Sequence, residues 1–112
     1  MEQSRITIDQ FHQLEIKIGE IISAEKVVDS DKLLRLEVNF NEEQPRQIVS
    51  GIATYFSDPA MLVGKKCAFA TNLEPRTIRG LESNVMILSV SDENSFSLLE
   101  TQPNTTVGLR VK

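Results

Sequence analysis

Residues 34–40 read Leu34-Arg35-Leu36-Glu37-Val38-Asn39-Phe40, a strict alternation of apolar and polar side chains. Because successive side chains of a β-strand point to opposite faces of a sheet, this alternation predicts a strand whose four apolar residues face inward. The arginine, the glutamate and the asparagine between them face solvent. This strand is the clearest structural signal in the chain.

The segments on either side of this strand also carry strand and turn signals. Upstream, residues 14–22 alternate apolar and charged side chains, and Gly19 interrupts them where we expect a bulge or a bend that lets a small barrel curl. Downstream, residues 41–45 (Asn-Glu-Glu-Gln-Pro) are typical of a polar turn. We therefore predict a hairpin that joins residues 34–40 to a strand at residues 47–49.

The remaining predicted elements are short. A capping box at residues 7–10 predicts an opening helical turn. Asp58 followed by Pro59 predicts a second helix, with Gly64 just past its end. Further strands are predicted at residues 66–71, 85–90, 96–99 and 109–111. Five main strands with a short helix between the third and the fourth are the order of an OB-fold, a mostly all-β barrel that commonly binds nucleic acid.

Length and composition favour a single domain over residues 1–112, with residues 1–5 as a flexible tail. One cysteine, Cys67, excludes an internal disulfide, and one histidine, His12, leaves no Cys/His cluster for a metal. No apolar run approaches the roughly 18 residues that span a bilayer, and the N-terminus lacks the apolar core of a signal peptide. We therefore expect a cytoplasmic protein with no membrane partner.

Sequence motifs for catalysis are missing from the chain. It has no Gly-rich phosphate loop and no Gly-x-Ser-x-Gly elbow, so we predict neither catalytic residues nor a cofactor. Cys67 alternates with Phe69, which favours a small buried side chain over a reactive thiol.

Positive charge is concentrated in residues 72–83 (Asn-Leu-Glu-Pro-Arg-Thr-Ile-Arg-Gly-Leu-Glu-Ser) and just before them. Four basic residues and one acidic residue give the window 65–79 a net charge of +3, whereas the whole chain carries −4. Arg76 and Arg79 lie three residues apart, where two guanidinium groups can bind phosphate oxygens or stack on bases. Composition alone is equally compatible with a solvated connection.

Six short motifs follow one another in a fixed order between residues 6 and 112. They are Ile16-Lys17-Ile18-Gly19, Asp31-Lys32-Leu33, Val49-Ser50-Gly51-Ile52, Val63-Gly64-Lys65-Lys66, Asn72-Leu73-Glu74-Pro75-Arg76 and Glu82-Ser83-x-x-Met86. In this order they resemble the tRNA-binding domain family. Its members are C-terminal domains of many bacterial methionyl-tRNA synthetases, free-standing structure-specific tRNA-binding proteins and eukaryotic synthetase cofactors.

The resemblance implies tRNA as a partner, an OB-fold, a homodimer, and a C-terminal extension over about residues 91–112 that packs against the barrel. It also implies an RNA site made of Lys32, Asn72, Arg76, Arg79, Ser83 and Met86. In that site the lysine and the arginines contact phosphates, the asparagine contacts a base edge or a ribose, and the serine and the methionine lie at the RNA-facing rim. Three ordinary alternatives stay open: a solvated Lys32, an Asn72 bonded to nearby backbone, and a Met86 in the core.

The chain departs from the family pattern at three places. One is the His-Pro that commonly precedes the Asp-Lys-Leu motif, which is missing here, and the other two are single residues. Val85 stands where a glycine usually precedes the methionine, and a branched side chain disfavours positive φ and a close approach of the backbone. Glu74 stands where lysine or arginine is common, so it replaces a phosphate contact with a repulsive charge. We therefore expect weaker RNA binding than in basic relatives.

The motifs together favour a non-catalytic module that docks folded tRNA, alone or beside the catalytic part of a methionyl-tRNA synthetase. Because the chain has five Phe, one Tyr and no Trp, recognition through shape and phosphates fits better than a base-stacking platform. Two alternatives remain open. Export-associated relatives suggest a chaperone-like dimer that binds polypeptides, and the domain can also serve only for dimerisation.

Overall fold

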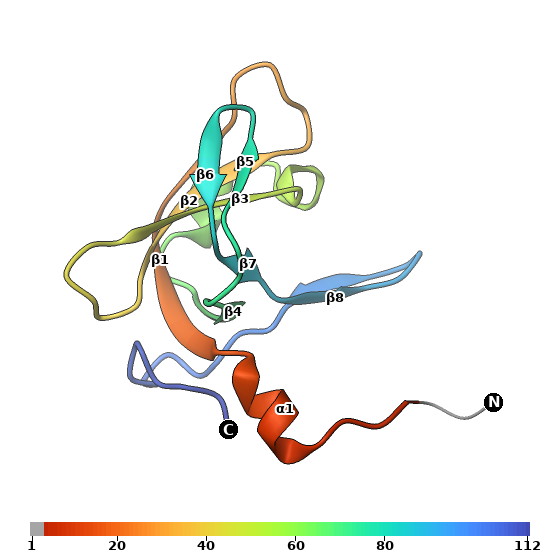
Figure 1. The fold of residues 1–112 in the computed structure, drawn as a ribbon. Coiled ribbons are helices and arrows are strands. Elements are labelled where there is room, and N and C mark those ends of the chain that lie inside the picture. The colour runs from red at the N-terminus through yellow and green to blue at the C-terminus, as the bar shows by residue number, and fades with distance from the viewer. Residues whose placement is uncertain (1–3) are drawn as a thin grey trace.

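Five antiparallel strands form a barrel at the centre of the molecule, in a computed structural model that describes residues 4–112. The strands pair in the order β3-β2-β1-β4-β7, and β3 also contacts β7, so that the barrel nearly closes (Figure 1). They are β1 (Ile16–Lys26), β2 (Leu34–Asn39), β3 (Arg46–Ser50), β4 (Lys66–Ala70) and β7 (Met86–Ile87). The predicted OB-fold is confirmed. Of the predicted tail at residues 1–5, residues 1–3 lie outside the described part of the chain.

The apolar face of β2 forms the centre of the barrel core. Leu34, Leu36 and Val38 are fully buried and Phe40 is 2% exposed, so all four predicted inward residues are inside. Phe40 packs edge-to-face against Phe69 of β4, with ring centroids 5.2 Å apart. Burying such a side chain stabilises the fold by roughly 1.5–3 kcal/mol relative to leaving it exposed. The predicted hairpin is also confirmed, since β2 pairs antiparallel with β3.

β1 changes partners along its length, pairing first with β4 and then with β2. The bulge in β1 lies between Ile21 and Ser23, so of the two alternatives predicted for Gly19, a bulge was wrong. A Cβ atom at Gly19 would lie 2.5 Å from Cγ1 of Val38 and 2.6 Å from Cε1 of Phe40. Glycine is needed here because β1 passes close to these side chains.

Two 3₁₀ helices, η1 (Ala53–Tyr55) and η2 (Pro59–Leu62), connect β3 to β4. The predicted helix corresponds to η2, which Asp58 caps by accepting a hydrogen bond from the N–H of Ala60 at 3.0 Å. Leu62 is fully buried where η2 packs against β1. The predicted position between the third and the fourth strand is confirmed.

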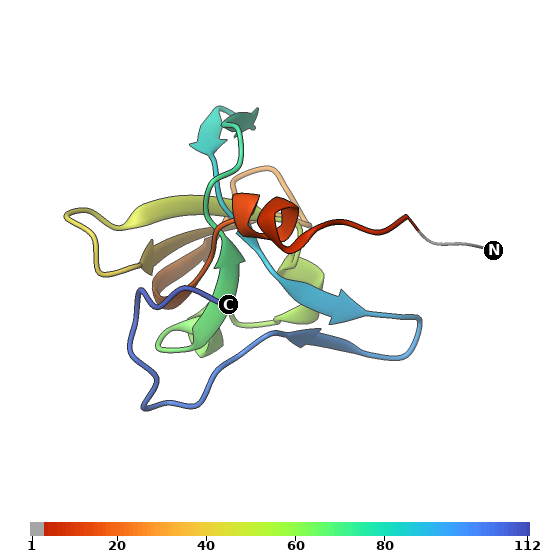
Figure 2. The same ribbon diagram turned by 60° about the horizontal axis from the view of Figure 1, so that its bottom comes forward.

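The N-terminal helix α1 (Ile8–Gln13) projects from the barrel beside the C-terminal segment (Figures 1 and 2). The predicted capping box is present: Thr7 Oγ1 accepts from the N–H of Gln10 at 3.0 Å, and the Gln10 side chain accepts from the N–H of Thr7 at 2.8 Å. No side chain of α1 is buried. The position of α1 therefore depends on polar contacts rather than on packing.

Two hairpins extend from the barrel: β5 (Arg76–Ile78) with β6 (Leu81–Ser83), and β8 (Ser89–Ser91) with β9 (Phe96–Leu98) (Figure 1). The single strand predicted at residues 85–90 was wrong. After Leu88, whose N–H donates to the carbonyl of Ala68 at 3.1 Å, the chain leaves the barrel and pairs with β9 instead. β7 and β8 thus belong to different sheets.

The C-terminal segment runs along β1. The N–H of Gly108 donates to the carbonyl of Ile18, and the N–H of Val111 donates to the carbonyl of Ile16, both at 2.7 Å. The strand predicted at residues 109–111 was wrong, because only Arg110 forms a β-bridge, with Lys17. Among residues 4–112, no helix has the length and hydropathy needed to cross a membrane.

Candidate nucleic-acid interface

The predicted arginine loop is a β-hairpin in the structure. Its strands β5 and β6 are joined by Arg79 and Gly80, whose φ angles are +54° and +78°. Positive φ at both central residues is the pattern of a type I′ turn, whose twist suits two antiparallel strands. The hairpin was not predicted, because such turns usually carry Asn-Gly or Asp-Gly rather than Arg-Gly.

The two arginines of this hairpin are available to a ligand. Arg76 begins β5 and Arg79 lies in the turn, and both side chains are exposed. Neither arginine forms a salt bridge within residues 4–112, where every salt bridge involves a different lysine or arginine. An unpaired guanidinium group offers a planar fork of donors that matches phosphate oxygens. The hairpin can therefore bind two phosphates.

Contacts at its sides hold the hairpin against the barrel. The side-chain amide of Gln47 in β3 donates to the carbonyl of Glu82 at 2.9 Å, and the N–H of Leu73 donates to the carbonyl of Asn84 at 3.3 Å. Figures 1 and 2 show the hairpin at the same end of the barrel as the loop between β1 and β2, residues 27–33. Two segments far apart in sequence thus form one surface.

The β1–β2 loop carries Lys32, and β1 ends just before the loop at Lys26. Lys32 is exposed, and its carbonyl accepts a hydrogen bond from the N–H of Ala53 at 3.0 Å, which fixes the loop backbone. The loop faces the hairpin across a groove of about 630 Å³, whose lining includes Lys26 and Arg79. The sequence pattern did not indicate Lys26, because the alternation in β1 stops at about residue 22 while the strand continues to Lys26.

Asn72 links the end of β4 to the segment that follows α1. Its Oδ1 accepts from the N–H of Glu15 at 2.8 Å, and its Nδ2 donates to the carbonyl of Gln13 at 2.7 Å. A primary amide has two hydrogens and two lone pairs, so one of each is left for another contact. The predicted RNA contact of Asn72 stays a prediction, alongside this structural role.

Ser83 and Met86 differ in accessibility. Ser83 is 6% exposed, and its hydroxyl donates to the carbonyl of Val85 at 3.0 Å, so its predicted place at an RNA-facing rim was wrong. Val85 belongs to the core and its φ is not positive, so the branched side chain is accommodated without strain. Met86 is 46% exposed, which excludes the alternative that it is a core residue.

Lys65 and Lys66 do not contribute their charge to the hairpin. Lys65 Nζ lies 3.3 Å from Glu100 Oε1, and Lys66 Nζ donates to two backbone carbonyl groups of the C-terminal extension at 2.7 and 2.8 Å. The net charge of +3 over residues 65–79 therefore does not act at one place. Cations on the hairpin and on the β1–β2 loop carry the positive charge of this surface.

Cys67 has the buried position that its alternation with Phe69 predicts. It is fully buried in β4, and this burial raises the pKa of its thiol to about 12. A neutral thiol is a poor nucleophile, and none of its atoms is exposed at the surface. The prediction of a small buried side chain is confirmed.

Known proteins of one family resemble this chain in sequence. Residues 16–110 match a family model described as "Putative tRNA binding domain". The chain is 42% identical over 107 residues to the methionine–tRNA ligase of Methanocella arvoryzae. This match covers 96% of the chain and 15% of the ligase. The chain therefore spans a small part of this curated relative.

Solved structures of similar shape include a MetRS-related protein from Pyrococcus horikoshii. It has a TM-score of 0.89 and 35% identity, and the match covers 98% of this chain and all of that one. The chaperone CsaA from Bacillus anthracis shares the fold, with a TM-score of 0.82 at 24% identity over 97% of this chain and all of that one.

Proposed function

Since this chain belongs to the tRNA-binding domain family, we propose that it docks folded tRNA through the β5–β6 hairpin and the β1–β2 loop. The observation that carries the proposal is the pair of exposed arginines on the hairpin, Arg76 and Arg79, which form no ion pair within residues 4–112. Lys32 extends the contact from the loop. The module does no chemistry itself.

The cellular role that we propose is delivery of tRNA in the cytoplasm. A module of this kind raises the local concentration of tRNA beside a methionyl-tRNA synthetase active site located elsewhere. Because the chain carries a net charge of −4, most of its surface repels RNA, and attraction depends on the few cations at this end of the barrel. Binding is therefore moderate in strength and sensitive to salt.

Charge reversal on the hairpin tests this function. Arg76→Glu combined with Arg79→Glu lowers the affinity for tRNA by about 1–3 kcal/mol, the scale of two charge-assisted contacts. The measurement is fluorescence anisotropy of labelled tRNA at about 50 and 200 mM salt. Arg5→Glu combined with Lys112→Glu changes the net charge equally and serves as the control, since Arg5 precedes α1 and Figure 1 places α1 and the C-terminus away from the hairpin.

Equal tRNA affinities for the two double variants contradict a role of the hairpin. A matched unstructured RNA is titrated in parallel. A module that docks folded tRNA binds the unstructured RNA less tightly than the tRNA. If the wild type binds neither RNA but binds a reduced, unfolded polypeptide, the chaperone-like alternative replaces the proposal.

We also propose that the protein is a homodimer that uses the α1 end of the barrel. Leu14, Leu109 and Val111 are 38%, 53% and 37% exposed in neighbouring segments, and a partner chain would cover them. Leu109→Asp combined with Val111→Asp gives a monomer in sedimentation velocity, whereas Val90→Asp, on the β8–β9 hairpin, leaves the dimer intact. A monomeric wild type contradicts this proposal without affecting the proposed tRNA contact.

A further inference from the structure

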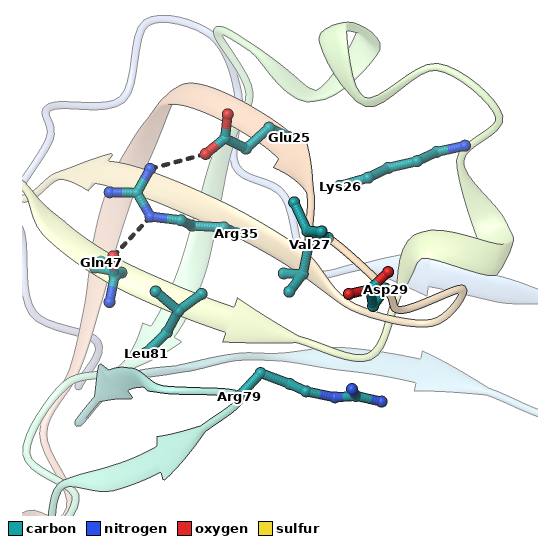
Figure 3. Close-up of a pocket in the computed structure, with 9 residues that line it drawn as sticks. Glu25, Lys26, Val27, Asp29, Arg35, Gln47, Arg79 and Leu81 are labelled. Carbon is teal, nitrogen blue, oxygen red and sulfur yellow. Dashed lines mark hydrogen bonds and ion pairs between the residues drawn. The ribbon is translucent and has the colours of Figure 1, made fainter.

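The groove between the β1–β2 loop and the β5–β6 hairpin has two apolar sides. Val27 and Val28 line it from the loop, and Leu81 lines it from the hairpin. Figure 3 shows Val27 and Leu81 on these two sides. Its volume of about 630 Å³ lies in the range of small-ligand pockets. Aliphatic side chains on both sides form a slot in which a planar group gains van der Waals contact on each face.

The base of the groove is rigid and polar. Arg35 Nε donates to Gln47 Oε1 at 2.6 Å, and Arg35 Nη1 donates to Glu25 Oε1 at 3.0 Å (Figure 3). The amide of Gln47 in turn donates to the hairpin backbone at 2.9 Å. The bonds to Gln47 and Glu25 fix the guanidinium group of Arg35, whose third nitrogen points away from Val27 in Figure 3. Because the floor of the groove is already ordered before a ligand arrives, less entropy is lost on binding.

Two cations and one carboxylate complete the lining. Lys26 ends β1 and Arg79 lies in the hairpin turn, and neither forms a salt bridge within residues 4–112. Asp29, at the turn of the loop, offers acceptor oxygens. A purely apolar ligand would leave the cations unused, and inorganic phosphate would leave the aliphatic slot unused. A nucleotide uses both, with its base in the slot and its phosphate beside Arg79.

We propose that this groove receives one unpaired nucleotide of the bound RNA. The base lies between the loop valines and Leu81, and its phosphate binds Arg79. This inference rests on the proposed function and adds a nucleobase to what the module recognises. Proteins that bind structured RNA often take unpaired bases from loops and ends. Here aliphatic walls take the place of an aromatic platform.

Val28 is the position that tests the slot, because it is 82% exposed and its substitution leaves the core intact. Val28→Asp places a carboxylate where the base would lie, and we expect about tenfold weaker binding of tRNA in the anisotropy assay. The matched control is Val90→Asp, which alters a 54% exposed valine on the β8–β9 hairpin and leaves the affinity within about twofold of wild type.

Nuclear magnetic resonance identifies the ligand chemistry. We expect nucleoside 5′-monophosphates to shift the amide signals of residues 27–29 and of Leu81, and ribose 5-phosphate at the same concentration to leave them in place. Equal tRNA affinities for the two aspartate variants overturn the inference while the proposed function stands. Ribose 5-phosphate shifts that match those of the nucleotides also overturn it, since the site then binds phosphate only.

Two other outcomes also count against the inference. Tight binding of free nucleotides that Val28→Asp abolishes without changing tRNA affinity identifies a small-molecule site instead. Absence of tRNA binding by the wild type removes the proposed function, and the inference with it.

Discussion

At Gly19 the barrel core has no room for an added atom. A Cβ atom there would lie 2.5 Å from Val38 Cγ1, well inside van der Waals contact, so the core must shift to accept it. We expect Gly19→Ala to lower the free energy of unfolding by about 1–3 kcal/mol, the usual cost of overpacking a core. Urea unfolding followed by circular dichroism measures this change.

Gly51→Ala is the matched control for Gly19→Ala. A Cβ atom at Gly51 has no neighbour within 4 Å, and its φ is not positive. Its free energy of unfolding should stay within about 0.5 kcal/mol of the wild-type value. Equal losses in the two variants would mean that the close approach of β1 to Val38 and Phe40 does not explain the glycine.

At the scale of single elements, the sequence predicts those that carry a long pattern. The alternation over residues 34–40 identifies β2, because four apolar residues at every second position leave only one face of the strand that can point inward. β5 and β6 have three residues each and an unusual turn, so no local pattern separates them from a loop. The apolar run 85–90 predicts a strand. Its division between two sheets depends on its partners, since β7 pairs with β4 and β8 pairs with β9, and the run itself does not reveal these pairings.

The candidate site was predicted in part for the same reason. Arg76 and Arg79 stand out by charge and turn chemistry, and both are exposed as expected. The direction of Ser83 depends on hairpin register, which the sequence does not reveal, and it points inward. Lys26 reaches the groove only because β1 extends beyond its apolar pattern.

α1 provides a test at this scale, because its attachment depends on polar contacts. Asn72 bonds the backbone of Gln13 and Glu15, and Arg110 donates to the carbonyl of His12 at 2.6 Å. We expect Asn72→Ala to loosen α1 and to speed amide hydrogen exchange in residues 8–15, since each lost hydrogen bond contributes about 0.5–1.5 kcal/mol. Hydrogen–deuterium exchange read by mass spectrometry measures this.

Asn84→Ala changes an exposed asparagine whose backbone, rather than its side chain, holds the hairpin, so it serves as the control. Unchanged exchange in residues 8–15 of Asn72→Ala would assign the attachment of α1 to Arg110 instead. Because this experiment needs no RNA, it separates the structural role of Asn72 from its predicted contact.

For the whole molecule, the perturbed pKa values predict a stability plateau at neutral pH. The hydrogen bond from Arg46 lowers the pKa of Glu42, and the hydrogen bond from Thr71 lowers the pKa of Glu15. A lowered folded pKa stabilises the protein above the ordinary value of 4.5, and this contribution is lost as the pH falls through the folded pKa. Stability therefore declines on the acid side of about pH 4.5.

Cys67 sets the alkaline side of the plateau. Burial raises the pKa of its thiol from 9.0 to about 12, so the unfolded chain loses this proton first as the pH rises. Stability is then lost between these two values. Thermal melts from about pH 3 to 11 record both declines. Glu42→Gln should flatten the acid decline and Cys67→Ala the alkaline one, and unaltered curves would assign the declines to other groups.

The β5–β6 hairpin adds no side chain between residues 74 and 82 to the hydrophobic core. Its type I′ turn and its hydrogen bond to Gln47 fix where it points, while its exposed residues, among them Arg76 and Thr77, add nothing to the core. Substitutions at the exposed positions of this stretch, whether natural or engineered, should therefore change the free energy of unfolding little. A library randomised here, on an unchanged barrel, should yield mostly folded variants with altered ligand preferences, which makes the domain a ready scaffold for new binders.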